Sequence, residues 1–574
     1  MKKVFVIIAM SIGIFLCMLD TTVMNVALPT IQTSLNVKLN NLSWALNIYT
    51  ILFATLTIPL GKIAERLGIN KTYISGLIIF IVGSTFSALS NTLPILILGR
   101  ALQSIGAAIV FPLSMSIGIA STDLTTRKKV IAILGITQGL AAALGPVIGG
   151  VLTQFLSWRW IFIINIPLSI ISLFICLSTL ELQENPKKEP IDFYGSSLSM
   201  LSLFALTLSL VQGRIWGWVS VRIISLLTFF TITLILFIIH ENKTKYPMIP
   251  LELFKNREFT GSAITIVLSN LFLVAVTVVL PTYFVKIQNK TELEAALLIT
   301  PITGMIFIFS PLAAILIDKL GSRAVIATGF LLMTISFILF ATINMKNLAL
   351  VIITCLILGI GYGIIAGPIT VLAASDFKGS LLNASQSVAG VLRQIGISLA
   401  IAIYVTGLYG NLVTAKHNSV KYIKNEVATL NIPQLKKQAV IDKSIYFLSH
   451  SANDSSGKHF TSNERELLIH KNYETALLSQ PTSLPKRAKV KIYSQVQAKV
   501  DKRLNDLNKQ INLTITKIKS FATNEYGKAF TKLYKYSIIF VALSLLTSFL
   551  FLQGRCFFCN HKINIYLPIA ELIS

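Results

Sequence analysis

Fourteen long apolar stretches dominate this sequence and leave few alternatives to a membrane fold. A helix needs about 20 mostly apolar residues to cross a bilayer. The stretches have the approximate limits 4–28, 42–61, 72–91, 94–120, 130–155, 160–180, 194–212, 220–240, 259–284, 295–317, 323–343, 347–372, 384–409 and 535–553. Of the 574 residues, 13% are charged, compared with about 25% in soluble domains. The pattern predicts an all-α polytopic membrane protein with 14 transmembrane helices.

The first stretch, Val4–Pro29, contains a single charge, Asp20. A carboxylate at this depth in a bilayer is energetically unfavourable, so it indicates a functional residue by default. The residues that share its helical face are small or flexible: Gly13, Cys17, Met24 and Ala27. We expect this face to border a cavity. The alternative is a structural aspartate that pairs with a neighbouring side chain.

Basic residues are unevenly distributed between the loops. The loops after even-numbered stretches are enriched in them, as in Lys62, Arg66 and Lys71. The positive-inside rule then places both termini in the cytoplasm, in a multi-pass protein of the plasma membrane. The net charge is +26, and residues 411–535 contain 22 Lys and Arg against nine Asp and Glu. These basic residues do not cluster on a folded soluble module, so nucleic acid is not an expected partner.

The fourth stretch also contains a charge, Arg100. In this orientation Arg100 lies about 9 Å from the outer end of its helix, at a depth similar to that of Asp20. Opposite charges at one depth are expected to pair or to share a water-filled cavity. Gln103 lies one turn further on the same face, and Arg393 in the thirteenth stretch is the other clear charge inside the helices. The alternative is that Arg100 extends to the outer membrane interface.

Several motifs occur in an order that is typical of one family. They are Leu19–Pro29, Gly61–Gly68, Leu98–Ala107, Gly135–Gly150, Trp158–Pro167 and Asp318–Arg323. Together they resemble the fourteen-helix drug:proton antiporter family of the major facilitator superfamily. The first loop motif departs from the family pattern, with Glu65 in place of aspartate and with Ile69 and Asn70 where a basic residue is expected.

The resemblance implies a major facilitator fold with two six-helix bundles and two linker helices between them. The implied divisions are 1–185 for the N-terminal bundle, 186–250 for the linker helices, 251–410 for the first five helices of the C-terminal bundle, 411–534 for an extracellular extension, and 535–574 for the last transmembrane helix and a cytoplasmic tail. Substrate would bind near the membrane midplane between the bundles.

These considerations give a set of candidate site residues. Asp20 and Arg100 are expected to couple transport to protons. The candidates for the substrate cavity are Met24, Asn25, Tyr49, Gln103, Gln138, Asn270, Gln386 and Arg393. The resemblance implies an inner gate of Gly61, Glu65, Arg66, Gly68, Lys71, Asp318 and Arg323. It also implies close helix packing through the antiporter motif, Gly135, Gly139, Gly145, Pro146, Gly149 and Gly150.

Residues 411–534 are expected to form a basic, largely helical extension outside the cell. Apolar residues recur at helical spacing from Tyr493 to Ile518 and more briefly from Val420 to Leu430. The positive charge would attract the extension to anionic lipid headgroups or cell-wall polymers. The alternative is a solvated linker, because an apolar stripe needs a partner that covers it.

The sequence predicts a transporter rather than an enzyme. The expected function is proton-coupled export of lipophilic, cationic drugs or toxic compounds by alternating access, with small molecules and protons as partners and no cofactor. No nucleotide-binding motif is visible, and Cys556, Cys559 and His561 alone do not make a metal site. Two alternatives stay open. One is export of an anionic or peptide-like compound with Arg393 or Arg100 as counter-ion, and the other is a non-transporting sensor that uses the extension.

Overall fold

The computed structural model describes residues 2–183, 190–288, 290–374, 376–430, 432–449, 460–479 and 485–551. All regular elements in these residues are helices, and they include 14 segments that are long and apolar enough to cross a membrane. The predicted all-α polytopic fold is therefore confirmed. The chain forms two compact units. Unit 1 comprises Met1–Val285, Lys290–Gly407 and Leu533–Ser574, and unit 2 comprises Lys286–Asn289 and Leu408–Lys532.

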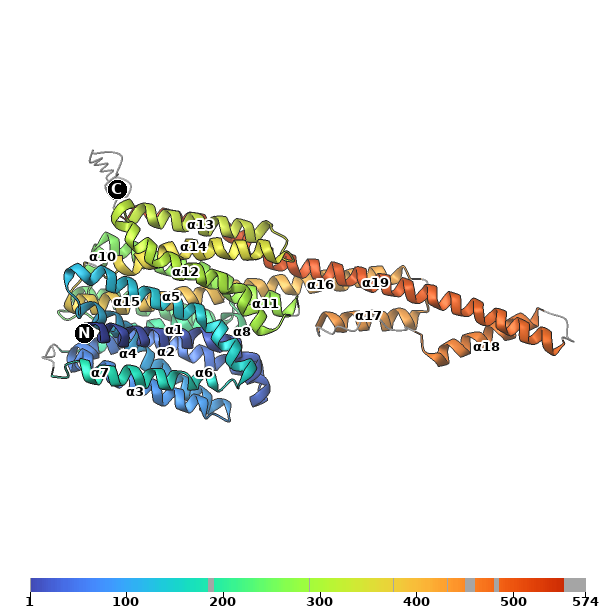
Figure 1. Cartoon of the computed structure of the whole chain (residues 1–574), viewed down its shortest axis with the longest axis horizontal. Helices are drawn as coiled ribbons and strands as arrows, with labels where there is room; N and C mark the ends of the chain where they lie inside the picture. Colours follow the sequence, from blue (N-terminus) through green and yellow to red (C-terminus); the bar gives the residue numbers. More distant parts are fainter. Residues whose placement is uncertain are drawn as a thin grey trace. The chain divides into compact units, whose positions relative to one another are not determined.

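The N-terminal half of unit 1 consists of helices that lie side by side with roughly aligned axes (Figure 1). They are α1 (Lys2–Leu35), α2 (Leu39–Leu67), α3 (Ile69–Ala88), α4 (Leu93–Ala120), α5 (Leu124–Phe155), α6 (Trp160–Ile163) and α7 (Asn165–Thr179). Helix α1 packs against α4, α5 and α7, and α3 packs against α4 and α7. The side chains of α1 are therefore enclosed by helices from several parts of the sequence.

Glycines bring α3 and α4 into backbone contact. A Cβ atom added at Gly99 would lie 2.6 Å from Ser87 N, and one added at Gly106 would lie 2.7 Å from Phe80 N. Both distances are shorter than real Cβ contacts, so any larger residue would push the two helices apart. Small residues allow membrane helices to approach closely in this way. Because Gly99 directly precedes Arg100, the packing fixes the position of the arginine relative to α3.

The sixth predicted span is divided by a break at Ile164 into α6 and α7. Pro167 has no backbone N–H, so it cannot donate to the carbonyl of Ile163 one turn earlier, and a proline in a helix favours an interruption there. Asn165 is the first residue of α7. A polar side chain therefore lies directly after the break, inside a membrane-spanning segment.

The remaining helices of unit 1 begin with a pair, α8 (Phe193–Trp216) and α9 (Val221–Lys243), in which α8 also contacts α2 and α15. The short α10 (Glu252–Lys255) precedes the C-terminal half, which consists of α11 (Arg257–Lys286), α12 (Glu292–Leu320), α13 (Ser322–Thr342), α14 (Leu348–Leu372) and α15 (Gly379–Ala400). Helix α12 packs against α5 and α14, and α15 packs against α2 and α4. The two halves thus meet along α2, α4 and α5. The predicted divisions at 185, 250 and 410 stay predictions.

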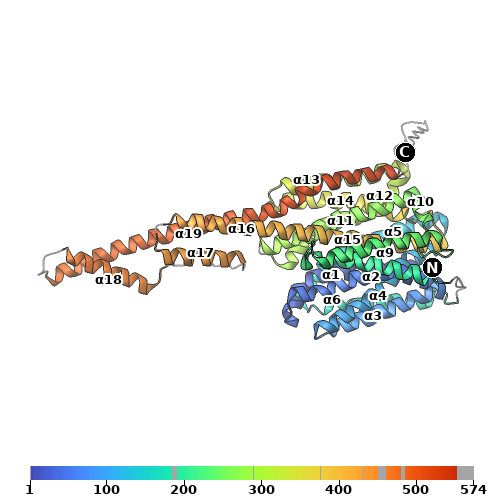
Figure 2. The same ribbon diagram turned by 180° about the vertical axis from the view of Figure 1, so that it is seen from behind.

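Unit 2 is a helical unit with its own apolar clusters. Its helices are α16 (Thr406–Ala428), α17 (Gln434–Ser449), α18 (Ser462–Leu478) and α19 (Lys486–Leu543), of which α16 begins and α19 ends in unit 1. Unit 1 also contains a π-helical turn, Ile401–Val405, directly before α16 and a 3₁₀ segment, Ser544–Leu550, directly after α19. Helices α17 and α18 lie alongside α19 (Figure 2). Ile423 and Val427 of α16 are buried in one cluster with Ile511 and Ile518 of α19.

Polar contacts support the apolar clusters of unit 2. Arg465 donates two hydrogen bonds to the Asp501 carboxylate, at 2.6 and 2.7 Å, and Thr461 forms a capping box with Glu464 at the start of α18. Within the predicted apolar stripe, Val500, Leu504, Ile511 and Ile518 are buried in these clusters, so the described part of unit 2 is not a solvated linker. The sequence missed one feature: α19 is a single helix of 58 residues that joins the predicted amphipathic helix to the last span.

Candidate functional site

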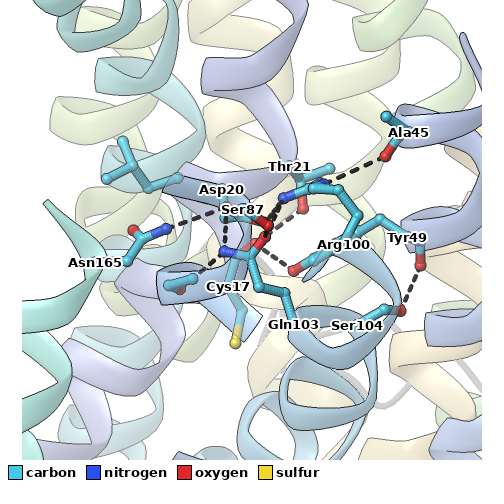
Figure 3. A network of polar contacts seen from close by, with 12 residues as sticks. Cys17, Asp20, Thr21, Ala45, Tyr49, Ser87, Arg100, Gln103, Ser104 and Asn165 are labelled. Atoms are coloured by element: carbon cyan, nitrogen blue, oxygen red, sulfur yellow. Dashed lines mark hydrogen bonds and ion pairs between the residues drawn. The ribbon is translucent and has the colours of Figure 1, made fainter. Parts of the chain in front are cut away.

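The centre of the N-terminal half is a buried ion pair between Asp20 of α1 and Arg100 of α4 (Figure 3). Arg100 Nη1 donates to Asp20 Oδ2 at 2.5 Å. Asp20 is 0% exposed and Arg100 is 1% exposed, so the pair is sealed from water and lipid. The expected pairing is therefore present, and the alternative in which Arg100 extends to the membrane interface is wrong.

Two amide side chains complete the coordination of the carboxylate. Gln103 Nε2 and Asn165 Nδ2 donate to Asp20 Oδ1, at 3.3 and 3.1 Å. From the described residues, Asp20 thus accepts three hydrogen bonds. An ionised carboxylate only accepts hydrogen bonds, so this arrangement is suited to the charged form of Asp20.

Arg100 and Gln103 are held by a second set of contacts from α2 and α3. Arg100 Nε donates to Ala45 O at 3.3 Å, and its guanidinium lies 4.3 Å from the centre of the Tyr49 ring, which is a favourable cation–π geometry. Gln103 Nε2 also donates to Ser84 Oγ, while its Oε1 accepts from Arg100 Nη1 and Ser87 Oγ. The three distances are 2.8, 2.9 and 3.2 Å respectively. The network therefore ties α1, α2, α3, α4 and α7 together.

The prediction that the Asp20 face borders a cavity is wrong for this conformation. Cys17, Met24 and Ala27 are all 0% exposed and pack within the bundle. The physical reason is that small side chains suit close helix packing as well as a cavity, and here α1 packs against α2, α4, α5, α6 and α7. Asp20 can meet water or substrate only after these helices move.

Asn165 is a site residue that the sequence analysis missed. It appeared there only within the motif Trp158–Pro167. The signal was available, because an asparagine inside an apolar span is unfavourable without hydrogen-bond partners, the same reasoning that identified Asp20. Ser84 and Ser87 gave no comparable signal, since serine is common in membrane helices.

The glycines of the antiporter motif on α5 face both halves of unit 1. A Cβ atom at Gly145 would overlap Thr22 Oγ1, and one at Gly149 would lie 2.9 Å from Val23 O. Gly139 and Gly150 instead face Ile306 and Leu293 of α12, and Gly135 faces Thr370 of α14, while Pro146 lies inside the helix. The motif therefore packs α5 against α1 beside Asp20 and against the C-terminal half.

The candidates for the substrate cavity fall into two groups. Tyr49 and Gln103 belong to the Asp20 network, and Met24 packs in the apolar core around Trp158 and Phe162. The others that can be placed belong to the C-terminal half or to a helix that packs against it. Gln138 is on α5, Asn270 is on α11, and Gln386 and Arg393 are on α15.

The contacts of this second group differ from those around Asp20. Asn270 Oδ1 accepts from Tyr362 OH at 3.1 Å. The Arg393 guanidinium lies 5.6 Å from the centre of the Phe111 ring of α4. Gln138 and Gln386 are buried. The side chains of Asn25 and Asp318, together with Cys556, Cys559 and His561, lie outside the described residues.

Two of the predicted gate residues reach the C-terminal half. Glu65 Oε1 accepts from Asn383 Nδ2 of α15 at 3.3 Å, while Lys62 Nζ lies 3.2 Å from Glu65 Oε2. A Cβ atom at Gly61 would lie 2.7 Å from Ser387 Oγ. The C-terminal end of α2 is therefore in close contact with the N-terminal part of α15.

The other predicted gate residues have different surroundings. Gly68 has a φ angle of 108°, so the turn between α2 and α3 needs glycine. Arg66 and Lys71 are exposed, and Arg323 lies over the ring of Phe549 at 4.2 Å. The gate residues whose side chains are described therefore do not form one continuous contact.

Arg127, which is not among the candidate site residues, adds a further connection between the two halves. Its Nη2 donates to Ala374 O and Phe377 O, at 3.1 and 2.5 Å. These carbonyls follow the end of α14, so Arg127 links the start of α5 to the C-terminal half. A pocket of about 650 Å³ lies at the same end, lined by residues that include Lys3, Glu65, Glu181 and Asn383.

Comparison with known proteins agrees with this architecture. Residues 10–401 match the Major Facilitator Superfamily. The chain is 30% identical over 423 residues to the multidrug transporter protein MdtP of Bacillus subtilis (strain 168), covering 72% of this chain and 77% of that protein. It is 29% identical over 406 residues to the riboflavin transporter RibZ of Clostridioides difficile (strain 630), covering 70% and 88%.

One solved structure supports the fold. The human organic anion transporter MFSD10 (TETRAN) has a TM-score of 0.50 at 14% sequence identity, covering 71% of this chain and 93% of that chain. At this identity the similarity concerns the arrangement of helices and not the choice of substrate.

Proposed function

This chain belongs to the Major Facilitator Superfamily, and we propose that it exports lipophilic, drug-like compounds from the cell in exchange for protons. Relatives that are named for multidrug transport or resistance support export. The riboflavin transporter among the relatives indicates that chains of this kind also handle other small molecules. The relatives therefore support transport of small molecules, but their names differ in the compound that is transported.

The main observation that supports proton coupling is the buried Asp20–Arg100 pair. A proton that binds Asp20 removes the negative charge and leaves Arg100 buried with no charged partner. The loss of one member of a buried pair destabilises a structure by about 3–5 kcal/mol. Protonation is thus coupled to a rearrangement of α1 against α4, which is the kind of change that alternating access requires.

In the proposed cycle, the carboxylate is ionised and paired in the conformation described here. The helices around Asp20 then move and expose it to water outside, where it takes up a proton. The neutral carboxyl no longer attracts Arg100, so the transporter can return and release the proton inside. Substrate moves in the opposite direction through the space between the halves.

We further propose that the protein lies in the plasma membrane with both termini in the cytoplasm and unit 2 outside. The basic loops that contain Lys62, Arg66 and Lys71 support this orientation, since positive charge favours cytoplasmic loops. Arg66 and Lys71 are exposed, so their charges are available to determine the topology.

Two kinds of substrate are possible, and they differ in charge. The first is a lipophilic cation whose charge is balanced by Asp20. In the described conformation three donors occupy the Asp20 oxygens, so a cation would have to bind after Arg100 has moved. The second is a compound with an acidic group that binds Arg393. The Arg393 Nε atom is buried and has no hydrogen-bond partner among the described residues, which favours this second candidate.

Inverted membrane vesicles test the proposal directly. A proton gradient should drive accumulation of a lipophilic dye by the wild-type protein, and Asp20→Asn should abolish it at equal expression. Glu241→Gln is the matched control, because Glu241 is also a buried acid but accepts hydrogen bonds from the backbone N–H groups of Met248 and Ile249. Full proton-driven transport by Asp20→Asn would overturn the proposal.

The same assay separates the remaining alternatives. A cationic dye and an anionic dye of similar size identify the charge of the substrate, and Arg393→Gln should reduce transport of the anionic dye only. A sensor that does not transport would accumulate neither dye under any gradient.

A further inference from the structure

We propose that Asn165 is a positioning residue whose side-chain oxygen accepts a hydrogen bond from the O–H group of Asp20 when this carboxyl is protonated. The inference rests on the proposed role of Asp20 as the proton site and extends it to a residue on α7. It concerns which neighbour can change from donor to acceptor when the proton arrives.

The contacts around Asp20 are suited to one protonation state only. Arg100 Nη1, Gln103 Nε2 and Asn165 Nδ2 all donate to the carboxylate. A protonated carboxyl has an O–H group that needs an acceptor, and a buried donor without one is unfavourable. At least one of the three neighbours therefore has to present an oxygen instead.

Two of the three neighbours are poorly suited to this change. Arg100 has donors only. Gln103 could turn its amide, but its Oε1 already accepts from Arg100 Nη1 and Ser87 Oγ, and its Nε2 also donates to Ser84 Oγ. A turn of the Gln103 amide would place its N–H groups against the N–H groups of Arg100. Gln103 is thus held as a donor to Asp20.

Asn165 has no such constraint. Its side chain is 0% exposed, its Nδ2 donates to Asp20 Oδ1 at 3.1 Å, and its Oδ1 has no hydrogen-bond partner within the residues that the structure describes. Rotation about the terminal torsion of asparagine is broad and roughly two-fold. A half-turn would replace the N–H donor by the carbonyl oxygen and, among the residues that the structure describes, break no other hydrogen bond of this side chain.

The oxygen that takes the proton follows from the same contacts. Oδ2 faces Arg100, whereas Oδ1 faces the two amides, so the proton goes to Oδ1. It arrives from water on the outer side and later leaves to water on the inner side, and no other covalent bond forms or breaks. The other titratable groups around Asp20 are Cys17 of its own helix, Tyr49 of α2 and Arg100 of α4.

Infrared difference spectroscopy on the full-length protein in lipid nanodiscs tests this role without a transport assay. Acidification should produce a carboxyl C=O band that is absent in Asp20→Asn and is therefore assigned to Asp20. In Asn165→Leu the O–H loses its acceptor, so the band should move to higher frequency. An Asp20 band at the wild-type frequency in Asn165→Leu would overturn the inference.

A transport measurement gives a second, independent readout. Asn165→Leu should lower net proton-driven transport by about tenfold to a hundredfold, while exchange of labelled for unlabelled dye without a gradient continues. Ser172→Ala is the matched control, because it removes another buried hydrogen bond from α7 to α1, to Ala9 O, without touching Asp20. Equal losses of net transport in both variants would mean that Asn165 only packs α7 against α1.

A second substitution at Asn165 and the result for Asp20→Asn keep the test decisive. Asn165→Val, which also lacks an acceptor, replaces the leucine variant if that protein does not insert. If Asp20→Asn retains proton-driven transport, the proposed function fails; the band shift then still decides whether Asn165 accepts from a protonated Asp20.

Discussion

The polar groups around the Asp20–Arg100 pair and those on α15 differ in how far their hydrogen-bonding capacity is used. Around Asp20 in the N-terminal half, the carboxylate, guanidinium and Gln103 amide all have partners. On α15 in the C-terminal half, both amide atoms of Gln394, Ser398 Oγ and Arg393 Nε lack a hydrogen-bond partner among the described residues. A satisfied network favours one arrangement, whereas unsatisfied groups retain capacity for a ligand or water.

This difference suggests a division of labour between the halves. In the proposed function, a proton neutralises Asp20 and so removes the charge partner of Arg100 in the N-terminal network. The polar face of α15 suits temporary contacts with a substrate, because no partner in the described part of the protein has to be displaced first. Phe111 of α4 lies against Arg393, so the two regions meet across the interface between the halves.

The largest expected effect comes from removal of the charge partner of Asp20. Arg100→Ala leaves a buried carboxylate without its cation, so we expect a loss of stability of about 3–5 kcal/mol and loss of proton-driven transport. Arg100→Lys should retain part of the activity, since it keeps the charge but loses the contacts to Ala45 O and Gln103. Thermal unfolding in detergent and dye transport measure the two effects.

The double variant Asp20→Asn with Arg100→Met sharpens this test. Removal of both charges should restore most of the thermal stability, because a buried pair can be replaced by uncharged groups at little cost. Transport should stay absent. A double variant that is no more stable than Arg100→Ala would show that the pair is not the source of the instability.

The next effect concerns the packing that encloses Asp20. Gly145→Leu would force α5 away from Thr22 of α1, so we expect transport to fall by about tenfold or more. Gly304→Leu of α12 is the matched control, because nothing lies within 4 Å of a Cβ atom at Gly304. Comparable transport by both variants at equal membrane insertion would show that the contact between α5 and α1 is dispensable.

A pair of glutamines tests the comparison of the halves most directly. Gln103 and Gln394 are both buried, at 0% and 1% exposure, but only Gln103 has hydrogen-bond partners that an apolar side chain would leave unpaired. Gln103→Met should therefore destabilise the protein by about 1–3 kcal/mol, whereas Gln394→Met should be neutral or stabilising. An equal fall of the melting temperature in both variants would show that Gln103 and Gln394 do not differ in their contribution to stability.

The smallest effect is expected from the removal of most of unit 2. A short flexible linker in place of Lys416–Lys528 should leave the transport rate within about twofold of the wild type, because the apolar clusters of unit 2 are its own. Asn411 Nδ2 donates to Ala529 O at 3.0 Å, so the two cut ends lie close enough for such a linker. Correct insertion with complete inactivity would make unit 2 part of the transport machinery.

The sequence by itself determined the membrane class, the 14 spans and the family. These properties depend on local composition and on residue order, because a bilayer requires long apolar helices wherever the chain crosses it. The depth of Asp20 and Arg100 was also accessible, since the rise of a helix converts a residue number into a position along the membrane normal. Opposite charges at one depth predicted a pair or a shared cavity, and the structure shows the pair.

Only the tertiary structure decided what surrounds that pair. Asn165 lies 145 residues from Asp20 in sequence, and its contact depends on how α7 is rotated against α1. The same small side chains that predicted a cavity instead pack closely, and Gly145 contacts Thr22 while Gly139 of the same helix faces α12. Helical spacing states which residues share a face, but the neighbour that covers this face is chosen by the packing of the whole bundle.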